Sequence, residues 1–281
     1  MISEDQHCFD LVRNHDKDRY LACLFAPETK RAHLMALYAF NVEVTRVRDV
    51  VSEAAIGEIR LQWWLDTLDG IYANEKQDHP VAIALSRAIV EGDLPKHALQ
   101  NLVKAHIFDF YSDPMSTLPD LEGYLGETSS ALIQLASLIL ARNEALENAE
   151  ASGLAGVAYG LVGILRSLPL QRQRQQCFIP IDKLVARDAT AADLMSDSNQ
   201  ASLEIVLAEL REHARSRLAQ ARKMSWTIKP AAMPAFLHVS LTDAYLSAIA
   251  RRGAGLMSKG ASVGQLHKQW IMWKAARTEM F

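Results

Sequence analysis

The sequence lacks the features that mark several whole classes of protein. Lysine and arginine number 30 against 33 aspartate and glutamate residues, so the formal net charge of −3 provides no global field that would attract nucleic acid. The cysteines Cys8, Cys23 and Cys177 follow no metal-like spacing, and we expect free thiols in a reducing compartment. The longest uncharged stretch, residues 151–165, is shorter than the roughly 20 residues that span a bilayer.

The beginning of the chain also lacks an apolar run. It reads MISEDQH, which is acidic and is unlike a secretory signal or an arginine-rich mitochondrial presequence. We therefore expect a cytoplasmic protein, with peripheral contact to a membrane surface left open.

Strand-like alternation of apolar and polar residues is absent, whereas helical periodicity dominates. No segment rich in Gly, Ser or Pro divides the chain, and no internal repeat is present. Helical periodicity without strand alternation predicts an all-α protein, and the lack of a linker or repeat predicts one domain that covers residues 1–281.

Helix starts are marked by capping residues and prolines. Ser3 with Gln6 predicts a capping box, and Pro27, Pro80 and Pro95 occupy positions typical of a first helical turn. The predicted helices include 28–51, 53–73, 120–142, 145–167, 200–226, 231–252 and 266–280. Residues 188–198 predict a loop or a short helix.

The predicted helix 28–51 carries a polar stripe. Steps of three and four residues place these side chains on one face: Tyr38, Asn41, Thr45, Asp49 and Ser52. Such a stripe either faces water or lines a cavity, and the pattern alone leaves both open.

Four glycines recur at helical spacing in the predicted helix 145–167, namely Gly153, Gly156, Gly160 and Gly163. Each interior glycine costs about 1 kcal/mol relative to alanine, so the spacing indicates that something approaches this face closely. A packed helix and a wall beside a ligand remain equally open explanations.

Several segments, in order along the chain, resemble the squalene/phytoene synthase family. They are Pro27-x-x-x-Arg31 with Ala36-Leu37-Tyr38-Ala39-Phe40, Asp120-Leu121-x-x-Tyr124, Gly160-x-x-Gly163-Ile164-Leu165-Arg166 with Phe178-Ile179-Pro180, and Asp243-Ala244-Tyr245-Leu246. The resemblance implies a helical bundle of the isoprenoid synthase type around an apolar central cavity. It also implies two acidic clusters that hold magnesium ions for prenyl diphosphates, because Mg²⁺ takes hard oxygen ligands.

The acidic clusters are where this sequence departs from the family. The positions of the first cluster, Asp-Asp-x-x-Asp, are Thr45, Arg46 and Asp49, of which only Asp49 is acidic. The positions of the second, Asn-x-x-x-Asp-x-x-Glu-Asp, are Gly163, Ser167, Leu170 and Gln171, and none is acidic. At an effective dielectric of about 20, a cation at position 46 would repel a divalent ion 4 Å away by about 8 kcal/mol. Pro169 also predicts a break in the helix that should carry the second cluster.

We therefore predict no metal site and no cofactor, with magnesium required only if the chain is a transferase after all. The candidate ligand-binding residues are Arg31, Tyr38, Asn41, Arg48, Asp49, Tyr124 and Arg166. The basic segment 166–176 predicts a polar loop, which either is simply solvated or grips a phosphate through its arginines.

Other segments resemble one branch of the family, that of the sixth mitochondrial complex I assembly factor and its bacterial relatives. They include Ala39-Phe40-Asn41-Val42-Glu43, Val47-Arg48-Asp49, Arg60-x-Gln62-x-Trp64, Asp69-x-Ile71-Tyr72 and His79-Pro80-Val81-Ala82-Ile83. The resemblance implies a role in assembly of respiratory complex I at the inner membrane, with complex I subunits or assembly intermediates as partners.

Three functions follow from these observations. The first is a non-catalytic synthase-like protein in complex I assembly, with a lipid or isoprenoid in the old cavity. The second is an active magnesium-dependent prenyl transferase that joins two prenyl diphosphates head to head. The third is a lipid or quinone carrier. The shortage of acidic residues favours the first.

Overall fold

The computed structural model describes residues 3–51, 53–196 and 198–281, so Ser52 of the predicted polar stripe lies outside the described residues. The chain is 81% helical, and the described ranges contain no strand. The all-α prediction is confirmed.

The α-helices are α1 (Glu4–His15), α2 (Lys17–Cys23), α3 (Glu28–Val50), α4 (Ala54–Tyr72), α5 (Pro80–Gly92), α6 (Lys96–Ala105), α7 (Leu118–Leu125), α8 (Ala131–Ala141), α9 (Ala149–Arg166), α10 (Leu168–Gln173), α11 (Ile181–Val185), α12 (Ala191–Ser196), α13 (Gln200–Lys223), α14 (Met233–Phe236), α15 (Thr242–Arg252), α16 (Leu256–Lys259) and α17 (Gln265–Thr278). Short 3₁₀ turns occupy His106–Phe110, Arg142–Asn148, Ser225–Thr227, Pro230–Ala232, Leu237–Leu241 and Gly253–Gly255, and a π-helical turn, Gly126–Ser130, joins α7 to α8.

The predicted helix starts are close to the observed ones. The Ser3 hydroxyl accepts a hydrogen bond from the Gln6 backbone N–H at 3.2 Å, which caps α1. Pro80 is the first residue of α5, whereas Pro27 and Pro95 each lie one residue before their helices. The predicted break at Pro169 is confirmed, because α9 ends at Arg166 and α10 begins at Leu168. The prediction of a loop over residues 166–176 was wrong, since most of that segment forms α10.

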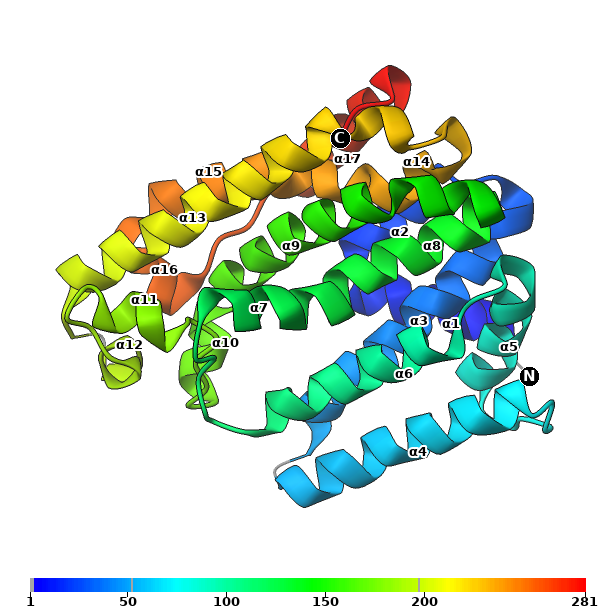
Figure 1. Ribbon diagram of the computed structural model, residues 1–281, viewed down its shortest axis with the longest axis horizontal. Helices are drawn as coiled ribbons and strands as arrows, with labels where there is room; N and C mark the ends of the chain where they lie inside the picture. The colour runs from blue at the N-terminus through cyan, green and yellow to red at the C-terminus, as the bar shows by residue number, and fades with distance from the viewer. Residues whose placement is uncertain (1–2, 52, 197) are drawn as a thin grey trace.

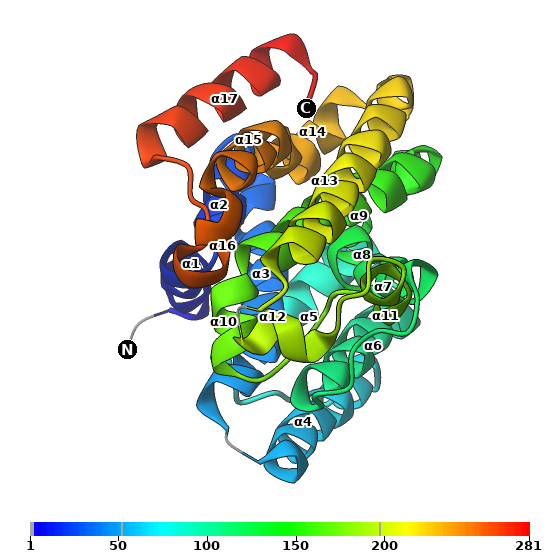
Figure 2. The same ribbon diagram turned by 90° about the vertical axis from the view of Figure 1, so that its left-hand side faces the viewer.

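Two apolar clusters make up the core. One is built mainly from α3, α4, α5 and α8, and the other mainly from α9, α13 and α15. Tyr20 and Tyr159 pack against both clusters. The long helix α13 runs along α9, and α1 lies against α3 and α5 (Figure 1). In the second view α17 and α4 form opposite outer sides of the bundle (Figure 2).

One helical stretch, Leu118–Ala141, is long and apolar enough to cross a membrane by those criteria alone, with a mean hydropathy of 1.2 over its most apolar window. Of that window, 61% is buried inside the protein. The central helices of globular proteins pass the same test, so the stretch serves here as a core helix.

The glycines of α9 divide between the two explanations that the sequence left open. A Cβ added at Gly156 would lie 2.3 Å from the Ser130 Cα, so here the helix packs directly against the backbone of the π-helical turn. At Gly153 and Gly163 an added Cβ would meet nothing within 4 Å. Close helix packing therefore explains Gly156 and does not explain Gly153 or Gly163.

We predict that Gly156→Ala destabilises the protein by about 1–3 kcal/mol, because backbone must move to admit the methyl group. The matched substitution Gly153→Ala is expected to be neutral or to stabilise by up to about 1 kcal/mol through helix propensity. Urea unfolding followed by circular dichroism measures both. Equal stability changes in the two variants would contradict the packing assigned to α9.

Candidate functional site

A cavity of about 220 Å³ lies between α3, α9 and the α7–α8 segment. Ligand pockets for small molecules usually measure about 300–1,000 Å³, so this cavity lies below that range. Its lining is more polar than we expected: beside Leu125, Leu132, Gly160, Gly163 and Ile164 it contains Arg19, Asn41, Thr45, His106, Tyr124, Thr128, Ser129 and Tyr159.

The cavity brings together some of the predicted residues. Asn41 and Thr45 of the polar stripe line it from α3, Tyr124 lines it from α7, and Gly163 lines it from α9. Tyr38 is almost fully buried and lies beneath the Arg19 guanidinium, whose Cζ is 5.7 Å from the ring centroid. The stripe on α3 therefore lines a cavity along part of its length rather than facing water throughout.

On one side of the cavity, Asp109 is a shared acceptor. Its carboxylate accepts a hydrogen bond from the Tyr124 hydroxyl at 2.9 Å and lies 2.6 Å from Nδ1 of His106. Its backbone carbonyl accepts from Nε of Arg48 at 3.0 Å and from the Gln176 side chain. Arg48 and Tyr124 were predicted as ligand-binding residues, and both bind this turn of the protein itself.

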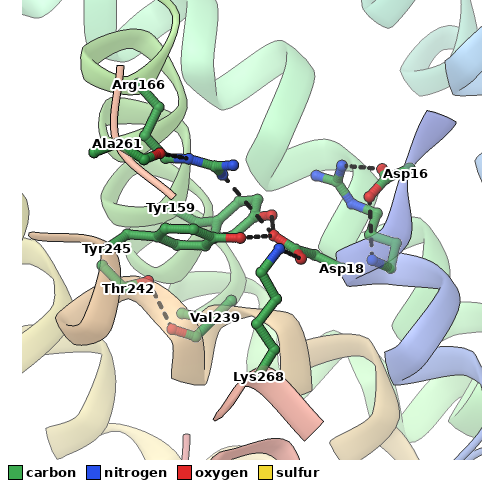
Figure 3. Close-up of polar contacts among 10 residues, drawn as sticks. Asp16, Asp18, Tyr159, Arg166, Val239, Thr242, Tyr245, Ala261 and Lys268 are labelled. Carbon is green, nitrogen blue, oxygen red and sulfur yellow. Dashed lines mark hydrogen bonds and ion pairs between the residues drawn. The ribbon is translucent and has the colours of Figure 1, made fainter. Parts of the chain in front are cut away.

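Behind the Tyr159 wall of the cavity lies a second shared acceptor, Asp18 on α2. Its carboxylate accepts hydrogen bonds from Nζ of Lys268 at 2.7 Å, from the Tyr245 hydroxyl at 2.5 Å and from the Tyr159 hydroxyl at 3.0 Å. Nη1 of Arg166 lies 3.9 Å away. Figure 3 shows these side chains pointing toward Asp18 from α9, α15 and α17.

The aromatic rings strengthen this cluster. Cζ of Arg166 lies 3.8 Å from the centroid of the Tyr245 ring, close enough for a cation–π contact, while Nε of Arg166 donates to the carbonyl of Ala261. Arg19 donates to the carboxylate of Asp16 at 2.8 Å. The cations near the cavity thus already have acidic or carbonyl acceptors within the chain.

Burial and hydrogen bonding act in opposite directions on Asp18. Burial alone would raise the pKa of its carboxyl, but the hydrogen bonds from Lys268 and Tyr245 and the positive charges of Lys268 and Arg166 outweigh that effect, so the pKa is lowered. Burial and the neighbouring Asp18 carboxylate raise the pKa of Tyr245. Tyr245 therefore stays protonated and donates to an ionised Asp18.

Other predicted residues lie outside the cavity lining. Arg31 donates to the carbonyls of Leu24 and Ala26, where it caps the end of α2. Arg46 lines a separate groove of about 290 Å³ between α3 and α4, together with Arg60 and Trp63. Arg46, a position of the first acidic cluster, therefore does not line the cavity, although its neighbour Thr45 does.

Most side chains at the remaining family-motif positions form ion pairs or hydrogen bonds with other parts of the chain. Asp49 is exposed and forms an ion pair with Arg174. Gln171 is buried, donates to the carbonyl of Ile164 at 2.7 Å and accepts from the Phe178 N–H at 3.1 Å. Ser167 donates to the same carbonyl at 3.0 Å, and Leu170 is exposed. These contacts stabilise the turn between α9 and α10.

The donor set at these positions does not fit Mg²⁺. A magnesium ion takes near-octahedral oxygen ligands, usually including carboxylates. Asp49 is paired with an arginine, and the Thr45 hydroxyl donates to the carbonyl of Val42. In the part of the chain that the structure describes, no group of three or more His, Cys, Asp or Glu side chains lies close enough together to hold a metal ion.

Sequence reasoning missed both shared acceptors. Asp18 follows Asp16 and Lys17 in a run that reads as polar surface, and Asp109 lies in a short 3₁₀ turn with no motif around it. The one available signal was indirect: Tyr124, Arg166 and Tyr245, which contact these carboxylates, all fall within the recognised motifs.

We predict that Asp18→Asn destabilises the protein by about 3 kcal/mol at pH 7, because it leaves the buried Lys268 without its ionised partner. Since the folded-state pKa of Asp18 is lowered, its contribution is complete above the unfolded-state pKa of about 3.9 and is lost as the pH falls through the folded-state value. Urea unfolding of both proteins from pH 7 to pH 3 should therefore show the difference shrinking.

The matched control is Asp113→Asn, at an exposed position, which should change stability by less than about 0.5 kcal/mol. An Asp18→Asn variant as stable as the parent at pH 7 would contradict the role assigned to this carboxylate.

The chain matches the squalene/phytoene synthase family over residues 12–268. Among curated proteins it is 31% identical over 247 residues to the NADH dehydrogenase (ubiquinone) complex I assembly factor 6 of Homo sapiens, an alignment that covers 88% of this chain and 74% of that protein.

Two solved structures are also similar. A dehydrosqualene synthase in complex with a ligand superposes with a TM-score of 0.87 at 16% identity, covering 98% of this chain and 96% of the other. The squalene synthase HpnC from Alicyclobacillus acidocaldarius gives 0.78 at 21% identity, covering 89% and 94%. These likenesses establish an isoprenoid synthase fold of the squalene synthase type, and with the match over residues 12–268 the chain belongs to the squalene/phytoene synthase family.

Proposed function

We propose that this protein is a non-catalytic member of its family that acts in the assembly of respiratory complex I. The observation that carries the assembly role is its 31% identity, over 88% of its length, to a protein named for that role. Its partners would then be complex I subunits or assembly intermediates, met at the cytoplasmic side of the inner membrane. The protein itself would be cytoplasmic, with peripheral membrane contact.

The contacts around the cavity support the non-catalytic part of the proposal. Prenyl transfer requires the departing diphosphate to be neutralised by metal ions or by cations that are free to bind it. Here Arg166 and Lys268 lie around the Asp18 carboxylate, and Arg174 pairs with Asp49. A diphosphate would have to displace these carboxylates or approach against their negative charge.

Cavity size bears on the expected ligand. At about 220 Å³ the cavity has no room for two prenyl chains, and a long-chain carrier would also need a larger space. A lipid or isoprenoid tail in this cavity stays a prediction. We therefore put forward neither the transferase nor the carrier as a second function.

The experiment is deletion of the gene in the organism that carries it, followed by measurement of assembled complex I on native gels and of NADH:quinone oxidoreductase activity in membranes. We expect both to fall, and we expect the wild-type gene to restore both. An Asp49→Asn gene should restore them equally well, because the proposal gives no metal-binding role to this carboxylate.

Unchanged complex I in the deletion strain would contradict the assembly role. Failure of Asp49→Asn to restore complex I, with the variant folded and present at the normal level, would contradict the non-catalytic role.

A further inference from the structure

Helix α17 carries apolar residues on both of its faces. On the inner face Met272 and Ala275 are buried in the bundle, and Lys268 reaches Asp18. On the outer face Leu266 is 81% exposed, Trp270 is 57% exposed and Trp273 is 50% exposed. Steps of four and three residues align these three side chains along one side of the helix. The outer face is therefore an apolar stripe that folding leaves in water.

The position of α17 leaves this stripe open. In Figure 2 the helix lies outermost, over α15 and α14, with its outer side directed away from the bundle. Trp270 also borders a groove of about 500 Å³ between α17 and α15, whose lining includes Ala244, Ile271 and Phe281. The apolar surface thus continues from the stripe into a groove beside it.

Cations lie directly on the tryptophan rings. Nζ of Lys274 is 5.8 Å from the ring centroid of Trp270, and Cζ of Arg277 is 4.9 Å from that of Trp273. Within the described residues neither cation has an ion-pair partner at 4 Å or less, and Arg251 lines a neighbouring groove with His267. Asp243, an acidic residue in the same grooves, is already paired with Arg222 at 2.8 Å. Helix α17 itself contains Lys274 and Arg277 on its outer side and no acidic residue, so the stripe is bordered by positive charge.

We propose that the outer face of α17, defined by Leu266, Trp270, Trp273, Lys274 and Arg277, binds the surface of a bilayer that contains anionic lipids. Tryptophan prefers the boundary between headgroups and acyl chains, where its ring is buried while its N–H stays near water. Lysine and arginine beside such rings contact anionic headgroups with their charged ends. This combination on a helix that lies flat is typical of interfacial membrane binding.

A second exposed apolar stripe, on α4, has a more acidic charge environment. On α4, Ile56, Ile59 and Trp63 are exposed, on the opposite outer side of the bundle from α17 (Figure 2). The exposed charges along that helix are Arg60, Asp66 and Asp69, of which Asp69 pairs with Lys96 at 2.9 Å, and the half-buried Glu58 adds a further carboxylate. The α4 stripe therefore offers an anionic bilayer no excess of positive charge, whereas α17 carries cations and no carboxylate, so charge favours α17 as the membrane contact.

This inference does not depend on the role in complex I assembly, because binding to lipid is measured with purified protein alone. The experiment is flotation of the full chain with vesicles of phosphatidylcholine mixed with phosphatidylglycerol, and with vesicles of phosphatidylcholine alone. The wild type should float with the anionic vesicles and less with the neutral ones, and added salt should weaken its binding.

Two sets of variants locate the contact. Trp270→Ser with Trp273→Ser should lower binding to anionic vesicles by about tenfold or more, because it removes the inserted rings. Lys274→Gln with Arg277→Gln should lower it by about tenfold on anionic vesicles and leave the weak binding to neutral vesicles unchanged. Ile56→Ser with Ile59→Ser on α4 is the matched control and should bind as the wild type does.

Circular dichroism checks that each variant is folded. The charge variant changes only exposed side chains, so it still tests the proposal if the tryptophan variant unfolds. Quenching of wild-type tryptophan fluorescence by brominated lipid should disappear in the folded tryptophan variant. The proposal would be overturned if the wild type failed to bind anionic vesicles. It would also be overturned if the folded tryptophan and charge variants bound these vesicles as strongly as the wild type. Loss of complex I assembly in the tryptophan variant without any vesicle binding by the wild type would assign this face to a protein partner instead.

Discussion

The buried carboxylate of Asp18 organises the centre of this bundle. It accepts hydrogen bonds from Lys268, Tyr245 and Tyr159, and thereby joins the second helix of the chain to α9, α15 and the C-terminal helix α17. A buried carboxylate is tolerated only when its lone pairs are satisfied, and removing a partner leaves an uncompensated charge. Lys268 and Arg166, which lie beside Asp18 behind the Tyr159 wall, therefore help to hold the fold together.

The pairing of these cations with Asp18 also affects whether the protein can bind a diphosphate. In a bundle of the squalene synthase type, a cation near the cavity can bind either a diphosphate or a carboxylate of the protein. A cation that is already paired with a carboxylate binds a diphosphate less strongly. Lys268 is 2.7 Å from Asp18, and Arg166 is 3.9 Å from it while lying against the Tyr245 ring. We propose that this internal neutralisation, together with a donor set that does not fit magnesium, leaves a fold adapted to binding partners and a membrane surface rather than to catalysis.

Local sequence signals predicted the fold well and the site only in part. Helix periodicity, the cap at Ser3 and the prolines at helix starts act over a few residues, so they located most helices. The partners of Asp18 lie far away in sequence, since Tyr245 is 227 residues later and Lys268 is 250 residues later. The local run His15-Asp16-Lys17-Asp18 looks like solvated surface, and only tertiary packing buries Asp18 within it. Arg48 and Tyr124 were recognised because they lie in sequence motifs. Asp109, the acceptor that they share, lies in no motif and is brought to them only by tertiary packing.

The central claim is that the chain's own carboxylates occupy the cations needed to hold a departing diphosphate. The most direct measurement is release of pyrophosphate when the purified protein is incubated with farnesyl or geranylgeranyl diphosphate and Mg²⁺. The account predicts no release above that of a protein-free control. Magnesium-dependent release that is abolished by Asp49→Asn would contradict it.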